Sequence, residues 1–186
     1  MSSSGQEHID RSVIERHYAF LKRLSEQPLS WLERVCWKAA RSARFDVRII
    51  WGHDGTPYLL RVYLLGRRGD ETAKRTFKPH AFLHYFFRSD ADSALHNHPW
   101  DDALSFVLTK GYLDHRLNPR TEKVEQRYVR PGRFNRIGQS DFHRVQLIDG
   151  PCWTLFLPGK RTQPSNGYDW GFLEGGKYTA WKEFRP

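Results

Sequence analysis

Hydrophobic and polar positions alternate along most of this chain in short runs that end at turn residues. A period of two residues is typical of β-strands, and Asp54–Gly55 between the first two runs favours a tight hairpin. The aromatic run 80–90 is apolar on both faces, which predicts a strand buried on both sides. The runs expected to form strands are 45–52, 57–66, 80–90, 104–117, 122–132, 141–150, 152–159, 169–173 and 178–184.

The order of these runs indicates the fold class. Strand-like and helical segments do not alternate after residue 44, so a parallel α/β fold is not expected. Many short strands at near-regular spacing, separated by Asp-Gly, Pro-Gly and Gly-Gly turns, are typical of an all-β sandwich or barrel. We therefore predict a single all-β domain over residues 45–186.

The first 44 residues have a different pattern, with apolar residues at helical spacing. Ser12 and Ser30 each precede a glutamate by three positions, as in the capping box that starts a helix, and Pro28 separates the two segments. We expect a polar tail and two short amphipathic helices over residues 1–44. The apolar stripe expected on the second helix consists of Leu32, Val35, Cys36 and Ala39.

The composition limits the class of protein. The 186 residues suffice for one domain with a real core, and the 15% aromatic content fits a core with a lined pocket. Cys36 and Cys152 lie far apart, so neither a disulfide framework nor a cysteine-based zinc site is expected. No apolar run is long enough for a membrane span, and the polar N-terminus lacks the apolar core of a signal peptide; a cytoplasmic location is expected.

The net charge of +9 favours an anionic partner. The basic residues are scattered, however, and clusters such as Gly66–Arg68 are short, which does not favour nucleic-acid binding. A positive rim that steers a small anionic substrate is the better interpretation.

The stretch Leu95–Asp102 contains two histidines two positions apart. Side chains at positions i and i+2 of a strand point to the same face, so His96 and His98 could bind one metal ion. His143 lies on another expected strand, and the strands of one barrel can bring such positions together. Neutral imidazole suits iron, zinc, nickel, copper and manganese, so the sequence predicts a transition-metal site.

Carboxylates could complete this site. Asp101 and Asp102 directly follow the histidine pair, and Asp114 lies on the next run. An added carboxylate would shift the metal preference toward iron or manganese. His84, on the aromatic run, could face the same interior.

With these residues the chain resembles the cupin superfamily of small metal-binding β-barrels. The cupin pattern has an HxH motif, an acidic residue and a strand that ends in glycine, then a Pro-Gly pair and another histidine; here Asp102, Gly111 and Pro131–Gly132 fit it beside the three histidines. The chain is most similar to a bacterial and phage branch with an HxHPW motif, from about residue 61 onward. The positions that match this branch are His96, His98, Pro99, Trp100, Asp101, Ser105, Leu108, Gly111, Tyr112, His143, Arg144, Trp153, Thr154, Leu155, Trp170, Gly171 and Phe172.

The resemblance implies a double-stranded β-helix, or jelly-roll barrel, with a divalent metal held by His96, His98 and His143. The usual cupin glutamate is absent, and Asp102 or Asp101 would replace it, directly or through a water. A site of three histidines without a carboxylate, similar to that of thiol dioxygenases, is the alternative. Fe(II) is the expected metal, with Zn, Mn or Ni as alternatives. Cupins often pair, so a homodimer is one arrangement that the resemblance allows, although no residue pattern requires it.

The expected function is that of a non-haem iron oxygenase, dioxygenase-like, acting on a small anionic metabolite. Two alternatives remain open: an isomerase or lyase that uses the ion as a Lewis acid, and a non-catalytic small-molecule-binding cupin. Tyr112 and His115 are candidates for proton transfer, and planar guanidinium groups could hold the anion. The expected substrate-binding residues are His84, Arg88, Trp100, Arg144 and Trp153.

Overall fold

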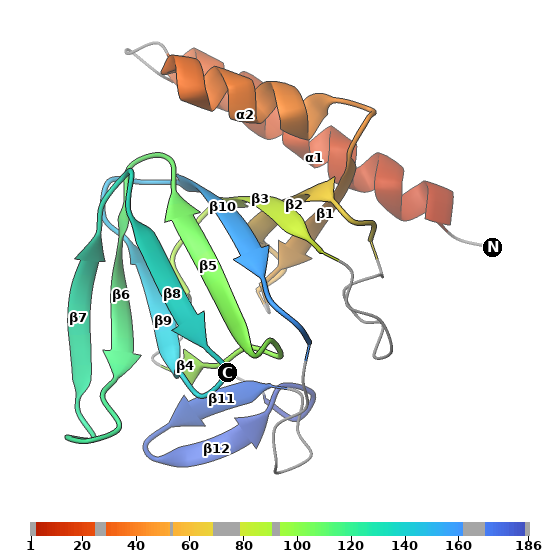
Figure 1. The fold of residues 1–186 in the computed structure, drawn as a ribbon. Coiled ribbons are helices and arrows are strands. Elements are labelled where there is room, and N and C mark those ends of the chain that lie inside the picture. Colours follow the sequence, from red (N-terminus) through yellow and green to blue (C-terminus); the bar gives the residue numbers. More distant parts are fainter. Residues whose placement is uncertain are drawn as a thin grey trace.

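The structure, a computed structural model, is mostly β with two N-terminal helices, as expected (Figure 1). It describes residues 3–24, 29–52, 54–68, 79–90, 94–161 and 170–184. The helices are α1 (Ser3–Leu24) and α2 (Trp31–Arg41). The first sheet has the strand order β1 (Asp46–Trp51), β2 (Pro57–Leu65), β3 (Ala81–Phe86), β10 (Cys152–Pro158), β5 (Asp102–Val107) and β8 (Phe134–Gly138). The second sheet has the order β12 (Lys177–Ala180), β11 (Gly171–Glu174), β4 (Leu95–His96), β9 (His143–Leu147), β6 (Tyr112–Leu117) and β7 (Val124–Val129).

Between residues 104 and 138 the strand assignments differ from the expected ones in two ways. The run 104–117 forms the end of β5 and all of β6, because Lys110 and Gly111 take positive φ angles of 62° and 101° and turn the chain between them. Strand β8 was not expected, since Phe134 and Ile137 are its only large apolar residues. Its pairing with β5 supplies the stabilisation that its own sequence lacks.

The first helix begins earlier than the sequence indicates. Ser12 lies inside α1, which starts at Ser3, so the expected capping box at Ser12 is wrong. Arg11 holds this part of the helix to the domain, because its guanidinium donates hydrogen bonds to the carbonyl oxygens of Ser42 and Phe45. The second capping box is present: Ser30 and Glu33 exchange both hydrogen bonds at the start of α2.

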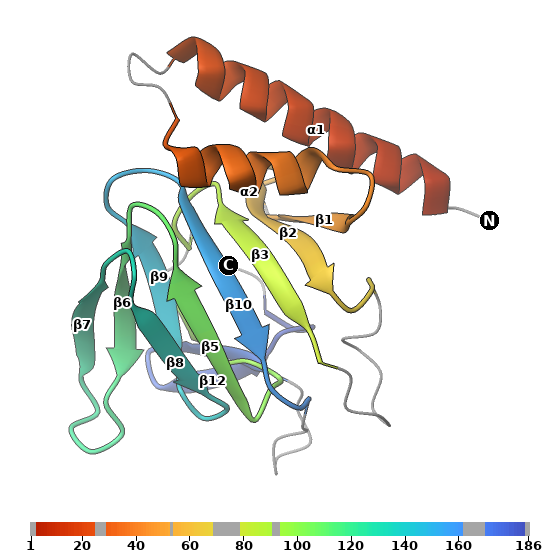
Figure 2. The same ribbon diagram turned by 45° about the horizontal axis from the view of Figure 1, so that its top comes forward.

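The two helices cover the outer face of the first sheet, the face turned away from the second sheet (Figure 2). Helix α2 buries Cys36, Trp37 and Ala40, whereas Val35 is exposed, so its apolar face is rotated from the expected stripe. The large ring of Trp37 explains the rotation, because it packs edge-on against Trp153 on β10. Helices and sheet thus share one hydrophobic cluster.

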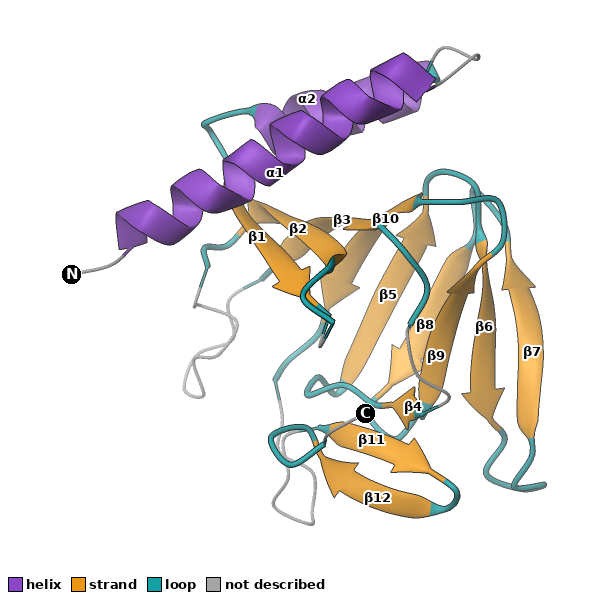
Figure 3. Cartoon of the chain, turned by 180° about the vertical axis from the view of Figure 1, so that it is seen from behind, coloured by secondary structure: helices purple, strands orange, loops and turns teal. Residues whose placement is uncertain are grey.

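The inner faces of the two sheets, which face each other, enclose a second apolar region (Figure 3). Val107 and Cys152 from the first sheet pack there with Tyr112, Val129 and Val145 from the second. Strand alternation decides which side chains reach this interior, because neighbouring positions point to opposite faces. The candidate site lies on these inner faces.

The hairpin of β11 and β12 completes the second sheet beside β4 (Figure 1). Phe172 on β11 pairs with His96, so the two-residue strand β4 has a neighbour on each side. No helix in the described part of the chain is long and apolar enough to cross a membrane.

Candidate metal centre

Three histidines from two segments of the second sheet converge in the interior. His96 on β4 and His143 on β9 are direct cross-strand partners, and His98 follows two residues after His96. One nitrogen from each of the three rings lies within 4.8 Å of the others. The Nε2 atoms of His98 and His143 are 3.0 Å apart. Within the described ranges, this is the group whose ligand atoms could hold a metal ion.

His98 does not lie on the strand, although the sequence pattern placed both histidines there. Strand β4 ends at His96, and Asn97 holds the next residues in place. The Asn97 backbone N–H donates to the Gly171 carbonyl, its side-chain oxygen accepts the Gly171 N–H at 2.8 Å, and its amide donates to the Gln139 carbonyl. A side chain at Gly171 would not fit, because a Cβ atom there would lie 2.4 Å from the Thr179 carbonyl oxygen.

A buried carboxylate fixes the orientation of His143. The Nδ1–H of His143 donates to Asp114 Oδ1 at 2.7 Å, so the lone pair of Nε2 points toward His98. Arg116 and Arg127 lie 3.0 and 3.5 Å from the other Asp114 oxygen. Burial alone would raise the pKa of Asp114, but the His143 hydrogen bond and the two arginines lower it. Asp114 was one of the expected candidate ligands. In the structure it instead orients the candidate ligand His143 by accepting a hydrogen bond from the far side of its ring.

A second carboxylate, which the sequence reading missed, lies behind His96. Asp90 Oδ2 is 3.8 Å from His96 Nδ1 and accepts the backbone N–H of Val145. The hydroxyl of Tyr58 donates to the other oxygen of Asp90. No motif marks Asp90, because its role depends on the packing of the segment after β3 against β9.

The protonation states of two rings suit metal binding. Burial lowers the pKa of His96 to about 4. The charge of Asp90 opposes this shift, His143 adds to it, and Asp114 opposes it. Burial, then the neighbouring histidines and Arg61, lower the pKa of His98 well below its ordinary value. A metal binds the neutral imidazole, so these rings need not lose a proton at neutral pH.

These shifts predict a pH dependence of stability for the metal-free protein. As the pH falls below 6.5, the unfolded chain protonates at position 96 while the folded chain does not until about pH 4. Stability is therefore lost across this window. Relative to His96→Gln, which cannot take up this proton, the wild type should lose about 3 kcal/mol more between about pH 7 and pH 4. Urea unfolding of both proteins in EDTA measures the difference, and parallel pH profiles would contradict it.

The two aspartates expected as oxygen ligands lie elsewhere. Asp102 accepts hydrogen bonds from Nε of Arg136 with both of its carboxylate oxygens, at the edge of the first sheet. Asp101 Oδ1 accepts the backbone N–H of Asp102. Neither belongs to the group of ligand atoms formed by the histidines.

This difference predicts unequal effects of two matched substitutions. Asp114→Asn should weaken metal affinity about 10- to 100-fold, because the amide no longer fixes the His143 tautomer. Asp102→Asn should leave the affinity unchanged, since its ion pair with Arg136 is exposed. Competition with a chelating dye measures both dissociation constants. A larger loss for Asp102→Asn would restore Asp102 as a ligand.

Two expected site residues lie on the outer face of the second sheet. His115 pairs with Arg144 across β6 and β9, one position away from the pairs that contain Asp114 and His143. Alternation therefore points His115 and Arg144 away from the interior. His115 Nε2 hydrogen-bonds with Gln146, and its Nδ1 lies 3.4 Å from the Arg144 guanidinium. Neither residue joins the three histidines, so their expected roles in proton transfer and anion binding do not fit this geometry.

The contacts found for Trp153 and Arg88 are with groups other than the three histidines. Trp153 is fully buried on the outer face of the first sheet, between Trp37 and Tyr85, so it does not wall the site. Arg88 forms an ion pair with Asp54 at 3.0 Å.

Tyr112 is connected to the site only at a distance. Its hydroxyl accepts a hydrogen bond from Asn135, and Arg116 joins Asn135 to Asp114. Burial raises the pKa of Tyr112 to about 12, so the phenol keeps its proton at neutral pH. Tyr112 thus belongs to the polar network behind His143.

The first sheet supplies the opposite wall of the site. Trp100 stacks on His98 with ring centres 5.6 Å apart, and Phe156 on β10 contacts both rings. His84 on β3 stacks on Phe156 and accepts a hydrogen bond from Arg61. Arg61 is a charged interior residue that the sequence reading did not select. Its position between apolar residues of β2 was the available signal.

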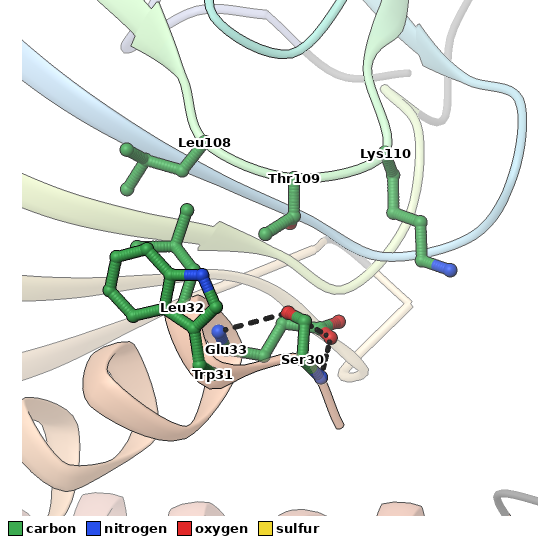
Figure 4. Close-up of a pocket in the computed structure, with 7 residues that line it drawn as sticks. All are labelled: Ser30, Trp31, Leu32, Glu33, Leu108, Thr109 and Lys110. Carbon is green, nitrogen blue, oxygen red and sulfur yellow. Dashed lines mark hydrogen bonds between the residues drawn. The ribbon is translucent and has the colours of Figure 1, made fainter. Parts of the chain in front are cut away.

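A separate hollow of about 360 Å³ is lined by residues of two segments (Figure 4). It lies between the start of α2 and the turn after β5. Its only carboxylate, Glu33, is bound in the capping box with Ser30. The hollow therefore offers no group of metal ligands. Its lining residues are Ser30, Trp31, Leu32, Glu33, Leu108, Thr109 and Lys110.

Comparisons with known proteins find similarity in fold alone. No protein-family profile matches the sequence, and no curated protein matches it. Among solved structures, hydroxypropylphosphonic acid epoxidase from S. wedmorenis is 11% identical, with 61% of this chain and 55% of that chain covered at a TM-score of 0.44. An oxalate oxidase in complex with glycolate is 16% identical, with 44% and 42% covered at a TM-score of 0.37. Both are cupin-type enzymes, and each match spans about half of that protein or less.

Proposed function

We propose that this chain is a metal-dependent cupin enzyme, a non-haem iron oxygenase that acts on a small anionic metabolite. In this proposal the two sheets are the halves of a jelly-roll barrel. The observation that carries it is the convergence of three imidazoles, that of His143 buried and those of His96 and His98 partly buried, with a carboxylate behind His143 that fixes its tautomer.

The residues fit a divalent transition metal. Three nitrogens within 4.8 Å of one another match the spacing of ligands around one ion, and the lowered pKa values of His96 and His98 keep their lone pairs available. Three protein ligands leave positions open for substrate. A bound Fe(II) ion would supply oxygen activation there, and other divalent ions would supply Lewis acidity.

The surrounding side chains orient the ligands and exclude water. Asn97 fixes the backbone between the two motif histidines, and Asp114 and Asp90 lie behind His143 and His96. The rings of Trp100 and Phe156 shield His98 on the side of the first sheet. A small polar molecule that entered this site would lose its hydrating water, and it would contact the rings of Trp100 and Phe156 on one side and the bound metal on the other.

The proposal is tested by elemental analysis of the purified protein, followed by anaerobic loading with Fe(II). Oxygen uptake is then recorded with small thiols, 2-oxo acids and hydroxy acids as candidate substrates. Oxygen consumption that requires both Fe(II) and one of these substrates is the expected result. Protein that binds no divalent metal at any loading would overturn the proposal.

A Lewis-acid isomerase or lyase is the second candidate. It is favoured by the absence of a carboxylate from the ligand group of the described residues, since three histidines also suit Zn(II). Substrate turnover with Zn(II) and without oxygen demand would select this function over the oxygenase.

A further inference from the structure

A positive charge lies on the inner face of the first sheet, opposite the three histidines. Arg61 is in register with His84 on β3 and lies among buried residues of β2. The guanidinium carbon is 4.5 Å from the ring centre of Phe82. Arg61 is itself only partly buried, and its place on the inner face directs a guanidinium group into the interior between the two sheets.

His84 holds the orientation of this guanidinium. Arg61 Nε donates to His84 Nε2 at 3.0 Å, so that nitrogen of His84 acts as an acceptor. Burial, together with the charge of Arg61, lowers the pKa of His84 well below its ordinary value, and the ring is neutral. Phe82 and Phe156 stack on the same ring, so His84 itself is fixed on the sheet.

One aromatic ring connects this pair to the candidate metal ligands. Phe156 has its ring centre 5.0 Å from that of His84 and 6.2 Å from that of His98. The charge of Arg61 also reaches His98, whose pKa it helps to lower. The cation and the histidines therefore belong to one interior space, with Arg61 on the first sheet and the ligands on the second.

From this arrangement we propose that Arg61, held by His84, binds the anionic oxygen group of the substrate, a carboxylate or a phosphoryl group, while another part of the substrate faces the three histidines. A guanidinium suits both groups because its N–H donors form a planar fork. The inference rests on the proposed function and names its anion-binding residue. It replaces Arg88 and Arg144, which the sequence pattern had favoured.

Anion binding to the Co(II)-loaded protein tests the role of Arg61. Acetate and methylphosphonate serve as separate probes, and the visible Co(II) spectrum and isothermal titration calorimetry report binding. Arg61→Met should weaken binding of at least one probe by about 30-fold or more. Arg61→Lys, which keeps the charge without the fork, should recover part of it. The probe with the larger loss identifies the carboxylate or the phosphoryl class.

Arg144→Met is the matched control, since it removes a guanidinium on the outer face of the other sheet, and it should bind both probes like the wild type. Metal content is measured on every sample. Protein without metal would refute the proposed function, whereas normal metal content with equal probe affinity in the wild type and Arg61→Met would refute only the role of Arg61.

A second measurement covers the case in which Arg61→Met does not fold. Arginine side chains of the metal-free wild type are labelled with ¹⁵N, and the Arg61 Nε signal is assigned by its loss in Arg61→Lys. Titration with acetate or methylphosphonate should shift this signal. An Nε signal that neither probe shifts would overturn the inference.

Discussion

Replacing His98 or His143 by alanine is expected to abolish stoichiometric metal binding. Each substitution removes one of the three converging nitrogens, and the two remaining rings cannot form a three-ligand site. Loss of a direct ligand should exceed the effect of a supporting carboxylate, so we expect affinity for Fe(II), Co(II) or Zn(II) to fall by more than about 100-fold. Elemental analysis after dialysis and chelator competition give the occupancy and the dissociation constant.

His115→Ala is the matched control for this experiment. His115 is also buried and also lies on the second sheet, but it points to the outer face and bonds with Gln146. Its removal should leave metal content unchanged, with circular dichroism confirming that all variants are folded. Equal metal content in His98→Ala, His143→Ala and the wild type would refute the metal centre.

The second large effect is on stability. Trp153→Ala should lower the free energy of unfolding by about 3–5 kcal/mol, because it empties a fully buried position beneath the helices. The ring centres of Trp37 and Tyr85 lie 5.0 and 4.7 Å from that of Trp153, so both lose a neighbour. Urea unfolding at constant pH measures the change. Metal affinity should stay the same, since Trp153 points away from the histidines.

Trp31→Ala provides the comparison on an exposed tryptophan. Trp31 begins α2 and its surface is 68% exposed, so its removal should change the free energy of unfolding by no more than about 0.5 kcal/mol. If Trp153→Ala instead weakened anion or metal binding with little loss of stability, the expected role of Trp153 as a wall of the pocket would stand.

Strand and helix content could be predicted from the sequence to a large extent. Period-two runs indicate strands whatever their partners are, and the capping box of Ser30 and Glu33 depends only on local contacts. The HxH motif is a weak signal alone, and it could be selected together with His143 because the combination resembles the cupin pattern; the structure brings the three rings together. The extension of α1 before Ser12 could not be predicted, since Arg11, which lies in that extension, is held by contacts with distant residues.

The faces of the strands were the main source of error. Tyr112 and His115 are three positions apart on β6, so they cannot share a face, and this could have been seen from the spacing alone. For Trp153 the sequence offers no such test, because β10 is buried on both faces. Asp90 became identifiable only from its contact with Val145, and the placement of Arg61 beside His84 only from the cross-strand register, which periodicity does not contain.

The shortness of β4 has a consequence for folding. His96 is held in the second sheet by pairing with His143 on one side and with Phe172 on the other, and these partners lie far along the chain. Such contacts have high contact order, and closing the long loops between them costs entropy. We therefore expect the histidine geometry to form late in folding, once the C-terminal hairpin has docked. Metal uptake would then mark a late step of folding, and a metal ion already bound would slow the opening of this part of the sheet.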